Sequence, residues 1–484
     1  MATKKDLVEA YSFSRRRLVT AFVSGAPGGR EVEPNRPGRT IVGGLALALL
    51  IVAGGAVLGV LKSPSTVEWD REALISDKDT GATYLLLRGS DEDTELRPLQ
   101  NITSAMLVLG SDLELEEVRG DEFERDRGAP IGILGAPASP PEASSLIQDG
   151  WTACTGAGGG SGIKIDLAEQ SSVELTPDTS FVVRTPEGAV HLIAQSAVGA
   201  ERGERAYVYP VPGGPMRDAI LQAVAGTGAG PAAVEVPDSF ITLFPQGRAL
   251  ELATFGLTRA DLTTPWVDAD RVPEAAAAKA EVGDLLVVGG DTTYLLTTDG
   301  TLKLDPFSLA VYRQLPRPAK DPLQEIDVEQ SPPGALPNFA DVQGASWPTD
   351  TTTLPAPRQL CAQLDVPGGQ PGVLLGTTAD GSQASAEDIA LSGVDVRVDP
   401  GHGAFVWAGD WLDDDSSAPV LVDDRGYQNP VGPGEEQVNL GYGDVDRVVV
   451  PQQWITLLRR GVPLTIDAAR CPPASGDPGP TSCS

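Results

Sequence analysis

The sequence predicts an α+β fold, mainly β, in which a single N-terminal transmembrane helix precedes a large extracytoplasmic body. Three observations support this prediction. One uninterrupted apolar run, residues 41–61, contains no charged side chain. The 484 residues include 55 glycines and 41 prolines, a composition that favours turns and short strands over long helices. Similar segments and β-rich pairs also recur in the part of the chain that follows the run.

The apolar run, IVGGLALALLIVAGGAVLGVL, has the length of a membrane crossing. Its 21 residues would form a helix of about 31 Å, which matches the hydrocarbon thickness of a bilayer. A cleavable signal peptide is the alternative, but its apolar region would be only about 7–15 residues long and would end at a small-residue cleavage site, which is not found here. We therefore expect an uncleaved transmembrane helix at 41–61. Its Gly55 and Gly59 form a G-x-x-x-G surface for close helix packing, although glycine is also common in membrane helices without such a partner.

Charge orients this helix. Residues 1–40 carry about four more positive than negative charges, and only Lys62 follows the run closely. Positive residues stay preferentially in the cytoplasm, so we expect a cytoplasmic segment at 1–40 and a single-pass protein of the inner membrane. Beyond the helix we expect a linker at 62–72, an extracytoplasmic (periplasmic) body at 73–470 and a flexible tail at 471–484. Since the whole chain carries −31, the part after residue 40 carries about −35, which argues against nucleic acid and anionic headgroups as partners.

The cytoplasmic segment contains an amphipathic helix. Leu7, Tyr11, Leu18 and Phe22 recur at helical spacing, and we place the three arginines at 15–17 on other faces. This helix could lie on the membrane surface or pack against another protein. The candidate docking residues are Tyr11, Phe13, Arg15, Arg16, Arg17, Leu18 and Phe22.

Internal repetition is the strongest indication of how the body is organised. Val236–Leu250 reads VPDSFITLFPQGRAL and Val450–Leu464 reads VPQQWITLLRRGVPL, with seven matching positions: Val, Pro, Ile, Thr, Leu, Gly and Leu. Strand pairs, most of them around a glycine-containing turn, are expected at 80–99, 180–193, 284–305 and 418–431. Helical inserts are expected at PMRDAILQAVAG and RVPEAAAAKAEVGD. The body should therefore contain several small β-rich units.

All four cysteines, Cys154, Cys361, Cys471 and Cys483, follow the apolar run. An even number on the exported side suits an oxidising compartment, and four cysteines allow three pairings. The Pro/Gly-rich segment between Cys471 and Cys483 makes that pair the easiest closure, which leaves Cys154 for Cys361. Free thiols, or a tail that pairs with another molecule, are the alternatives. A zinc site is not expected, because the sequence has no C-x-x-C and only two histidines.

Residue patterns for catalysis are weak. A phosphate-binding loop requires G-x-x-x-x-G-K-[ST], but in TGAGGGSGIKI at 155–165 an isoleucine separates the last glycine from the lysine. His191 and His402 are far apart in sequence, and no G-x-S-x-G is present. The aspartates at 413–415 and 423–424 could hold calcium or cleave glycan, but solvated loops are the simpler interpretation. We expect no catalytic residues, no cofactor and no metal site.

Four stretches, in order along the chain, resemble one family. They are AYSFSRRRLVTAFVSG at 10–25, LRPLQNITSAMLVLG at 96–110, GAPIGILGAP at 128–137 and the W-x-x-C of Trp151 and Cys154. None is specific alone. Together they make the chain resemble EccB, a membrane core component of actinobacterial type VII (ESX) secretion systems, along essentially its whole length. The chain departs from that family in the insertion GSDEDTE and in the Cys471–Cys483 tail.

The resemblance implies an elongated extracytoplasmic body with a central core domain and about four small repeat units, similar to phage-lysin cell-wall-binding repeats. It also implies a long-range disulfide, Cys154–Cys361 in this chain. The implied role is that of a structural subunit that is anchored by one helix and self-associates in the periplasm to support protein export. The implied partners are the EccC, EccD and EccE membrane subunits and the mycosin protease.

Two other function classes stay open. A membrane-anchored cell-wall-binding protein would need exposed aromatic side chains, and Trp407 with Trp411 is the only close pair of tryptophans, although both could equally pack a hairpin. The other class is an enzyme. ATPase activity is ascribed to some members of the family, whereas an exported hydrolase would need a nucleophile or a metal site that the sequence does not present.

Overall fold

In the computed structural model the chain divides into two parts, Met1–Thr66 and Val67–Ser484, and each is described by itself. The residues that the structure describes are 3–24, 47–48, 67–88, 93–119, 123, 127–156, 162–177, 179–196, 205–225, 233–266, 280–317, 322–329, 337–342, 346–350, 352–353, 359–378, 393–411 and 416–473.

The first part contains the expected N-terminal helix, α1 (Lys4–Ser24). Its start is fixed by Thr3, whose backbone N–H and hydroxyl both donate to the Asp6 carboxylate, at 2.9 and 2.7 Å. No helix among the described residues is long and apolar enough to cross a membrane. The run at 41–61 lies outside those residues except for positions 47 and 48.

Four of the five sheets in the described part of Val67–Ser484 share one strand order. In each, three consecutive strands pair antiparallel, and the fourth strand returns to pair in parallel with the first. The first sheet contains β1 (Ala73–Asp77), β2 (Thr83–Arg88), β3 (Thr94–Pro98) and β4 (Leu115–Val118). The second contains β8 (Thr179–Arg184), β9 (Val190–Ser196), β10 (Arg205–Pro210) and β11 (Val234–Glu235). The third contains β12 (Leu285–Val288), β13 (Thr292–Thr297), β14 (Gly300–Leu304) and β15 (Glu325–Val328). The fourth contains β20 (Ala404–Gly409), β21 (Ala418–Val422), β22 (Tyr427–Pro430) and β23 (Val449–Pro451).

A helix connects the third and fourth strands of each of these sheets. The four helices are α3 (Ile102–Leu109), α5 (Pro215–Ala225), α8 (Pro306–Gln314) and α10 (Glu436–Asn439). Two of these helices begin with a side-chain cap. The Asn101 side chain accepts from the Ser104 N–H, and Asp305 forms a capping box with Ser308. A connecting helix gives the chain the length that a parallel return requires.

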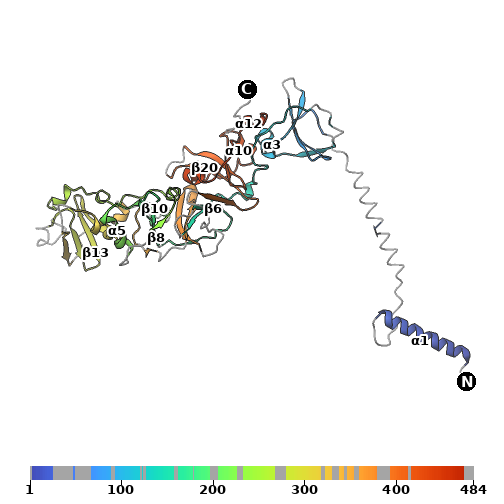
Figure 1. The fold of residues 1–484 in the computed structure, drawn as a ribbon, viewed down its shortest axis with the longest axis horizontal. Helices are drawn as coiled ribbons and strands as arrows, with labels where there is room; N and C mark the ends of the chain where they lie inside the picture. Colours follow the sequence, from blue (N-terminus) through green and yellow to red (C-terminus); the bar gives the residue numbers. More distant parts are fainter. Residues whose placement is uncertain are drawn as a thin grey trace. The chain divides into compact units, whose positions relative to one another are not determined.

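The fifth sheet, the core sheet, has the order β19-β6-β5-β17-β18-β7. Its strands are β5 (Thr152–Gly156), β6 (Ile163–Leu167), β7 (Glu174–Leu175), β17 (Gln359–Asp365), β18 (Gly372–Thr377) and β19 (Val394–Val398). In sequence, the second and third sheets lie between β7 and β17. In Figure 1, β6 therefore lies beside strands from the late part of the chain, which belong to the same core sheet.

Short elements complete the described part. Two strands add to sheets already given: β16 (Thr352–Thr353) pairs with β8, and β24 (Arg459–Arg460) pairs with β22. The short α-helices are α6 (Asp238–Ile241), α9 (Phe339–Val342), α11 (Gln452–Thr456) and α12 (Ile466–Arg470). The 3₁₀ turns are η2 (Ala143–Ser145), η3 (Leu252–Phe255), η4 (Asp261–Thr263) and η6 (Pro367–Gly369).

Three hydrophobic cores link the five sheets. Side chains alternate between the faces of a strand, so Phe181 and Val183 of β8 face the core sheet, whereas Val182 packs with the third sheet. In the same way Val406 of β20 faces the core sheet and Phe405 packs with the first sheet. The second and fourth sheets are therefore buried on both faces, and both pack on the core sheet.

Most of the predicted elements in the body are confirmed. The expected strand pairs correspond to β2–β3, β8–β9, β12–β13–β14 and β21–β22. The insert PMRDAILQAVAG forms α5. The second insert, at 271–284, lies largely outside the described residues.

Candidate functional site

The two similar segments, Val236–Leu250 and Val450–Leu464, occupy equivalent places in the second and fourth sheets, and we call them the anchoring segments. Each begins at the fourth strand of its sheet, β11 or β23, and enters a short helix, α6 or α11. Pro237 and Pro451 precede these helices, in the extended conformation that ends a strand. The sequence repeat therefore marks the same structural step in both sheets.

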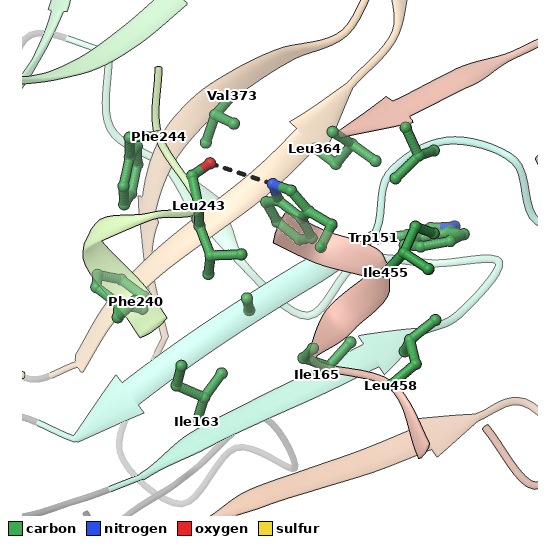
Figure 2. Close-up of a cluster of buried hydrophobic side chains, with 14 of the residues drawn as sticks. Trp151, Ile163, Ile165, Phe240, Leu243, Phe244, Leu364, Val373, Ile455 and Leu458 are labelled. Carbon is green, nitrogen blue, oxygen red and sulfur yellow. Dashed lines mark hydrogen bonds between the residues drawn. The ribbon is translucent and has the colours of Figure 1, made fainter. Parts of the chain in front are cut away.

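The anchoring segments meet inside the core that covers one face of the core sheet. The indole N–H of Trp454 donates to the Leu243 carbonyl oxygen at 3.1 Å, which is the dashed line in Figure 2. Phe240 and Phe244 pack edge to face with their ring centroids 5.5 Å apart. Ile455 and Leu458 pack in the same cluster as Ile163 and Ile165 of the core sheet (Figure 2). Each anchoring segment thus attaches its own sheet to the core sheet and also touches the other segment.

Each anchoring segment then returns along the third strand of its own sheet. The Gly247 N–H donates to Val208 O at 2.9 Å, and the Gly461 N–H donates to Gln428 O at 3.0 Å. A Cβ at either glycine would collide with a side chain of that third strand, Tyr209 or Asn429. Glycine is therefore required for this close approach.

A third copy of this return occurs in the first sheet, where sequence reasoning missed it. The Gly128 N–H donates to Leu96 O at 2.9 Å, and a Cβ there would collide with Glu95. The shared signal is a glycine followed three residues later by a buried aliphatic residue. It reads GAPI at 128–131, GRAL at 247–250 and GVPL at 461–464.

A disulfide joins Cys154 of β5 to Cys361 of β17, the pairing that the family resemblance implied. The two residues are direct partners in the antiparallel register, with their Cα atoms 4.1 Å apart. They are 1% and 0% exposed, with Val173 packed against them. The cross-link spans 207 residues and closes the chain segment that holds the second and third sheets.

The other two cysteines lie at the end of the chain. Cys471 is buried and also disulfide-bonded, and its backbone carbonyl accepts a hydrogen bond from the Gly132 N–H. Cys483 lies outside the described residues.

The candidate docking residues lie on α1, whose described side chains are all exposed. At about 100° per residue, Leu7, Tyr11, Leu18 and Phe22 form one stripe. Phe22 is 93% exposed. Phe13 falls on the opposite side of the helix, and the Arg15 position borders the stripe instead of facing away from it. The packing residues Gly55 and Gly59 lie outside the described residues.

The candidate catalytic patterns are placed as follows. The glycine-rich stretch at 155–165 connects β5 to β6, which are neighbouring antiparallel strands. A phosphate-binding loop instead connects a strand to a helix, so this connection lacks the required geometry. His191 lies on β9, and His402 lies in the turn between β19 and β20. Within the described residues, no three His, Cys, Asp or Glu side chains are grouped so as to hold a metal ion.

Two sets of residues that the sequence analysis considered as binding candidates make contacts that stabilise the fold. Trp407 of β20 packs edge to face on Phe405, with ring centroids 4.9 Å apart, and is half-buried in the β20–β21 hairpin. The buried Asp423 carboxylate accepts from the backbone N–H groups of Arg425 and Tyr427. It also pairs with the Arg425 guanidinium at 2.8 Å, and this hydrogen bond raises the pKa of Arg425. Asp423 therefore stabilises a hairpin turn, while positions 413–415 lie outside the described residues.

The five sheets, the buried disulfide and the N-terminal helix define a mainly β class of protein with some helices. Comparison with known proteins identifies the family. The chain belongs to the family "Type VII secretion system ESX-1, transport TM domain B", whose model matches residues 1–473. The resemblance to EccB is thereby confirmed.

Curated relatives match parts of the chain. The protein named ESX-1 secretion system ATPase EccB1 from Mycolicibacterium smegmatis (strain MKD8) is 29% identical over 204 residues, 42% of this chain and 38% of that protein. Its namesake from Mycobacterium tuberculosis (strain ATCC 25618 / H37Rv) is 34% identical over 153 residues, 31% of this chain and 30% of that protein. The matched segments thus span less than two fifths of these relatives.

Solved structures match the fold over a much larger share. A chain of the structure titled "an intact ESX-5 inner membrane complex" is 18% identical, with a TM-score of 0.58 over 100% of this chain and 98% of that chain. A chain of "EccB3 dimer from the ESX-3 core complex" is also 18% identical, with a TM-score of 0.58 over 82% of this chain and 100% of that chain. At this identity the likeness concerns the fold.

Proposed function

We propose that this chain is a structural subunit of the inner-membrane complex of a type VII (ESX) secretion system. The observation that carries the proposal is the fold match over the whole chain to a chain of an intact ESX-5 inner membrane complex. The match to a chain of an EccB3 dimer supports self-association of the body. In this role the chain anchors by one helix, and copies of the body associate in the periplasm to support protein export.

The proposed topology follows from the sequence. Residues 1–40 are cytoplasmic, 41–61 cross the inner membrane, 62–72 form a linker and 73–470 form the extracytoplasmic body, with a tail at 471–484. The basic excess before the apolar run and the disulfide-bonded, acidic body after it support this orientation.

We further propose that the body consists of four repeat units around a central core domain. The shared strand order of the first, second, third and fourth sheets supports this division, as does the position of the connecting helix in each. The anchoring segments and the glycine returns support common descent of at least three units. In this arrangement the core sheet, with its disulfide, is the central core domain.

The cytoplasmic helix α1 is the proposed docking element for other membrane subunits. Its apolar stripe, Leu7, Tyr11, Leu18 and Phe22, is exposed, and Phe13 provides a second apolar side chain on the opposite side. Apolar side chains on two sides suit a groove between protein partners better than a flat lipid surface. The proposed partners are the EccC, EccD and EccE subunits and the mycosin protease.

Purification from host membranes in mild detergent tests the proposal. A tagged full-length chain should co-purify other ESX membrane subunits in one large particle. A chain that purifies alone, and that sediments with purified peptidoglycan, would instead support a cell-wall-binding protein.

A second candidate function, ATP hydrolysis, comes from the names of the relatives, which include the word ATPase. The only basic residue of the glycine-rich stretch is Lys164, which lies on β6 opposite Cys154. Phosphate release by the purified full-length chain, abolished in Lys164→Ala, would support a phosphate site there. Equal phosphate release by the variant would remove this stretch as its source.

A further inference from the structure

An open cavity lies where the first and fourth sheets meet, and we call it the seam cavity. Its volume is about 490 Å³. The turn that follows the first glycine return supplies its apolar lining, with Ile133, Leu134, Ala136 and Ala138. The β21–β22 turn adds two charged residues, Asp424 and Arg425. Residues that belong to both sheets therefore form the wall of the cavity.

Leu134 differs from the rest of this apolar lining. Its neighbours Ile133 and Ala136 are 7% and 8% exposed, whereas Leu134 is 53% exposed. A single exposed leucine is ordinary on a protein surface, but this one lies in the wall of a cavity, where a segment of chain that filled the cavity would remove it from water.

The C-terminal segment leaves the folded body beside this cavity. The Gly132 N–H donates to the backbone carbonyl of Cys471 at 3.1 Å, directly before the lining residue Ile133. Ala468 and Ala469 of α12 pack in the same hydrophobic core as Ile133. The segment that begins at Cys471 therefore starts next to the cavity wall.

A disulfide restricts where that segment can go. Cys471 is disulfide-bonded, and Cys154 and Cys361 bond to each other. The chain has four cysteines, so Cys483 is the partner that remains. With that pairing, residues 472–482 form a closed loop, and a closed loop of this length extends at most roughly 20 Å from Cys471. Because Gly132 contacts Cys471, the seam cavity lies within that reach.

The composition of the loop matches the cavity. Residues 472–482 read PPASGDPGPTS, with four prolines and one charged residue, Asp477. Proline rings can cover apolar surface, and proline has no backbone N–H that would lose its hydrogen bond to water. The Arg425 side chain is 53% exposed, and its charge complements Asp477, although its pairing with Asp423 and the neighbouring Asp424 weaken that attraction. Apolar contact is therefore the main attraction that we expect.

We propose that the loop 472–482, closed by a Cys471–Cys483 disulfide, folds over the seam cavity and covers Leu134. The loop then fastens the C-terminal segment across the junction of the first and fourth sheets. The family model matches residues 1–473, so nearly all of the loop lies outside the matched residues. The proposal does not depend on the secretion role, because it rests on the cavity, the exposed leucine and the position of Cys471.

Photo-cross-linking of the full-length chain in detergent tests it. Leu134→p-benzoylphenylalanine places a photoreactive group on the side chain that the loop covers. After irradiation, peptide mapping by mass spectrometry should find residue 134 joined to a peptide from 472–482, in a product that keeps the mass of one chain. The matched control is Leu115→p-benzoylphenylalanine, since Leu115 is 50% exposed but does not line the cavity, and it should give no cross-link to the loop.

A second variant opens the loop. Cys483→Ser leaves the buried Cys471 in place, and the cross-link yield should fall at least about threefold, because the freed segment samples many more positions. If the cross-linking variant does not fold, hydrogen exchange replaces it. Peptides that cover 133–138 should then exchange at least about threefold faster in Cys483→Ser than in the parent chain, whereas peptides that cover β2 should be unchanged.

Three cross-linking results would overturn the proposal. They are residue 134 joined to a second copy of the chain, residue 134 joined to another protein, and a folded variant that gives no cross-link. An unchanged yield or unchanged exchange in Cys483→Ser would also overturn it, because the disulfide would then not hold the loop over the cavity.

Discussion

Trp454→Phe should loosen both anchoring segments at once, although only one of them is altered. Trp454 is fully buried, and its indole N–H is the donor to Leu243 of the other segment. Phenylalanine is a fair replacement, because Phe240 occupies the equivalent position in Val236–Leu250. The variant removes the donor and leaves the buried Leu243 carbonyl without it, which costs about 1–3 kcal/mol. The lost side-chain volume of about 40 Å³ adds about 1 kcal/mol.

Hydrogen exchange measured by mass spectrometry reads out this loss where it occurs. A decrease of about 2–4 kcal/mol in the free energy of local opening corresponds to exchange about 30- to 900-fold faster. Peptides that cover α6 and those that cover α11 should both lose protection. Trp407→Phe is the matched control, since Trp407 is half-buried and its indole has no hydrogen bond among the described residues. Faster exchange confined to α11, or equal effects of the two variants, would refute the coupling between the segments.

Four further outcomes are expected. Gly461→Ala should lower the free energy of unfolding by about 1–3 kcal/mol, because its Cβ collides with Asn429, whereas Gly213→Ala, with open space around its Cβ, should be neutral in a urea titration. Replacing both Cys154 and Cys361 by alanine should cost about 5 kcal/mol, since the disulfide closes a loop of 207 residues, and an unchanged melting temperature in oxidising buffer would contradict this. Asp305→Asn should be at least as stable as the parent at pH 7, because burial raises the pKa of Asp305 in the folded protein and so makes its charged form costly. This cost disappears as the pH falls through the folded pKa toward 3.8, so the difference in urea midpoint between variant and parent should shrink over that pH range. Arg15–Arg17 replaced by glutamates should reduce the yield of assembled complex while the circular dichroism of the body stays normal, and a normal complex yield would count against α1 as a docking element.

Local features of the fold were predictable from the sequence because they depend on neighbouring residues. Glycine-containing turns between apolar runs identified hairpins such as β8–β9 and β13–β14. Helical periodicity identified α1 and α5. The fifteen-residue repeat was visible because its matching residues perform the same step twice, a strand end, a short helix and a glycine return.

The core sheet was not predictable, because its strands come from segments far apart in the chain. Pairing of β5 with β17 brings together residues 207 positions apart, and no local pattern encodes that register. The same holds for Asp166 and Arg397, which meet only through the parallel pairing of β6 with β19. The third glycine return, at Gly128, was missed because its sequence shares only the glycine and one aliphatic residue with the other two returns.

One expectation needed revision on physical grounds. The Arg15 position borders the apolar stripe of α1, and Phe13 lies opposite it, so the helix is less cleanly two-sided than its spacing suggested. The sequence already disfavoured a phosphate-binding loop at 155–165, because an isoleucine separates the last glycine from the lysine. The strands that flank this stretch, β5 and β6, are antiparallel neighbours, whereas such a loop leads from a strand into a helix.

The most direct test of the secretion role is the mass of the detergent-extracted particle. The full-length chain, purified from host membranes and weighed by native mass spectrometry, should be found in particles that contain at least two copies of it together with other ESX membrane subunits. Particles that contain one copy of the chain and no other protein would contradict the account.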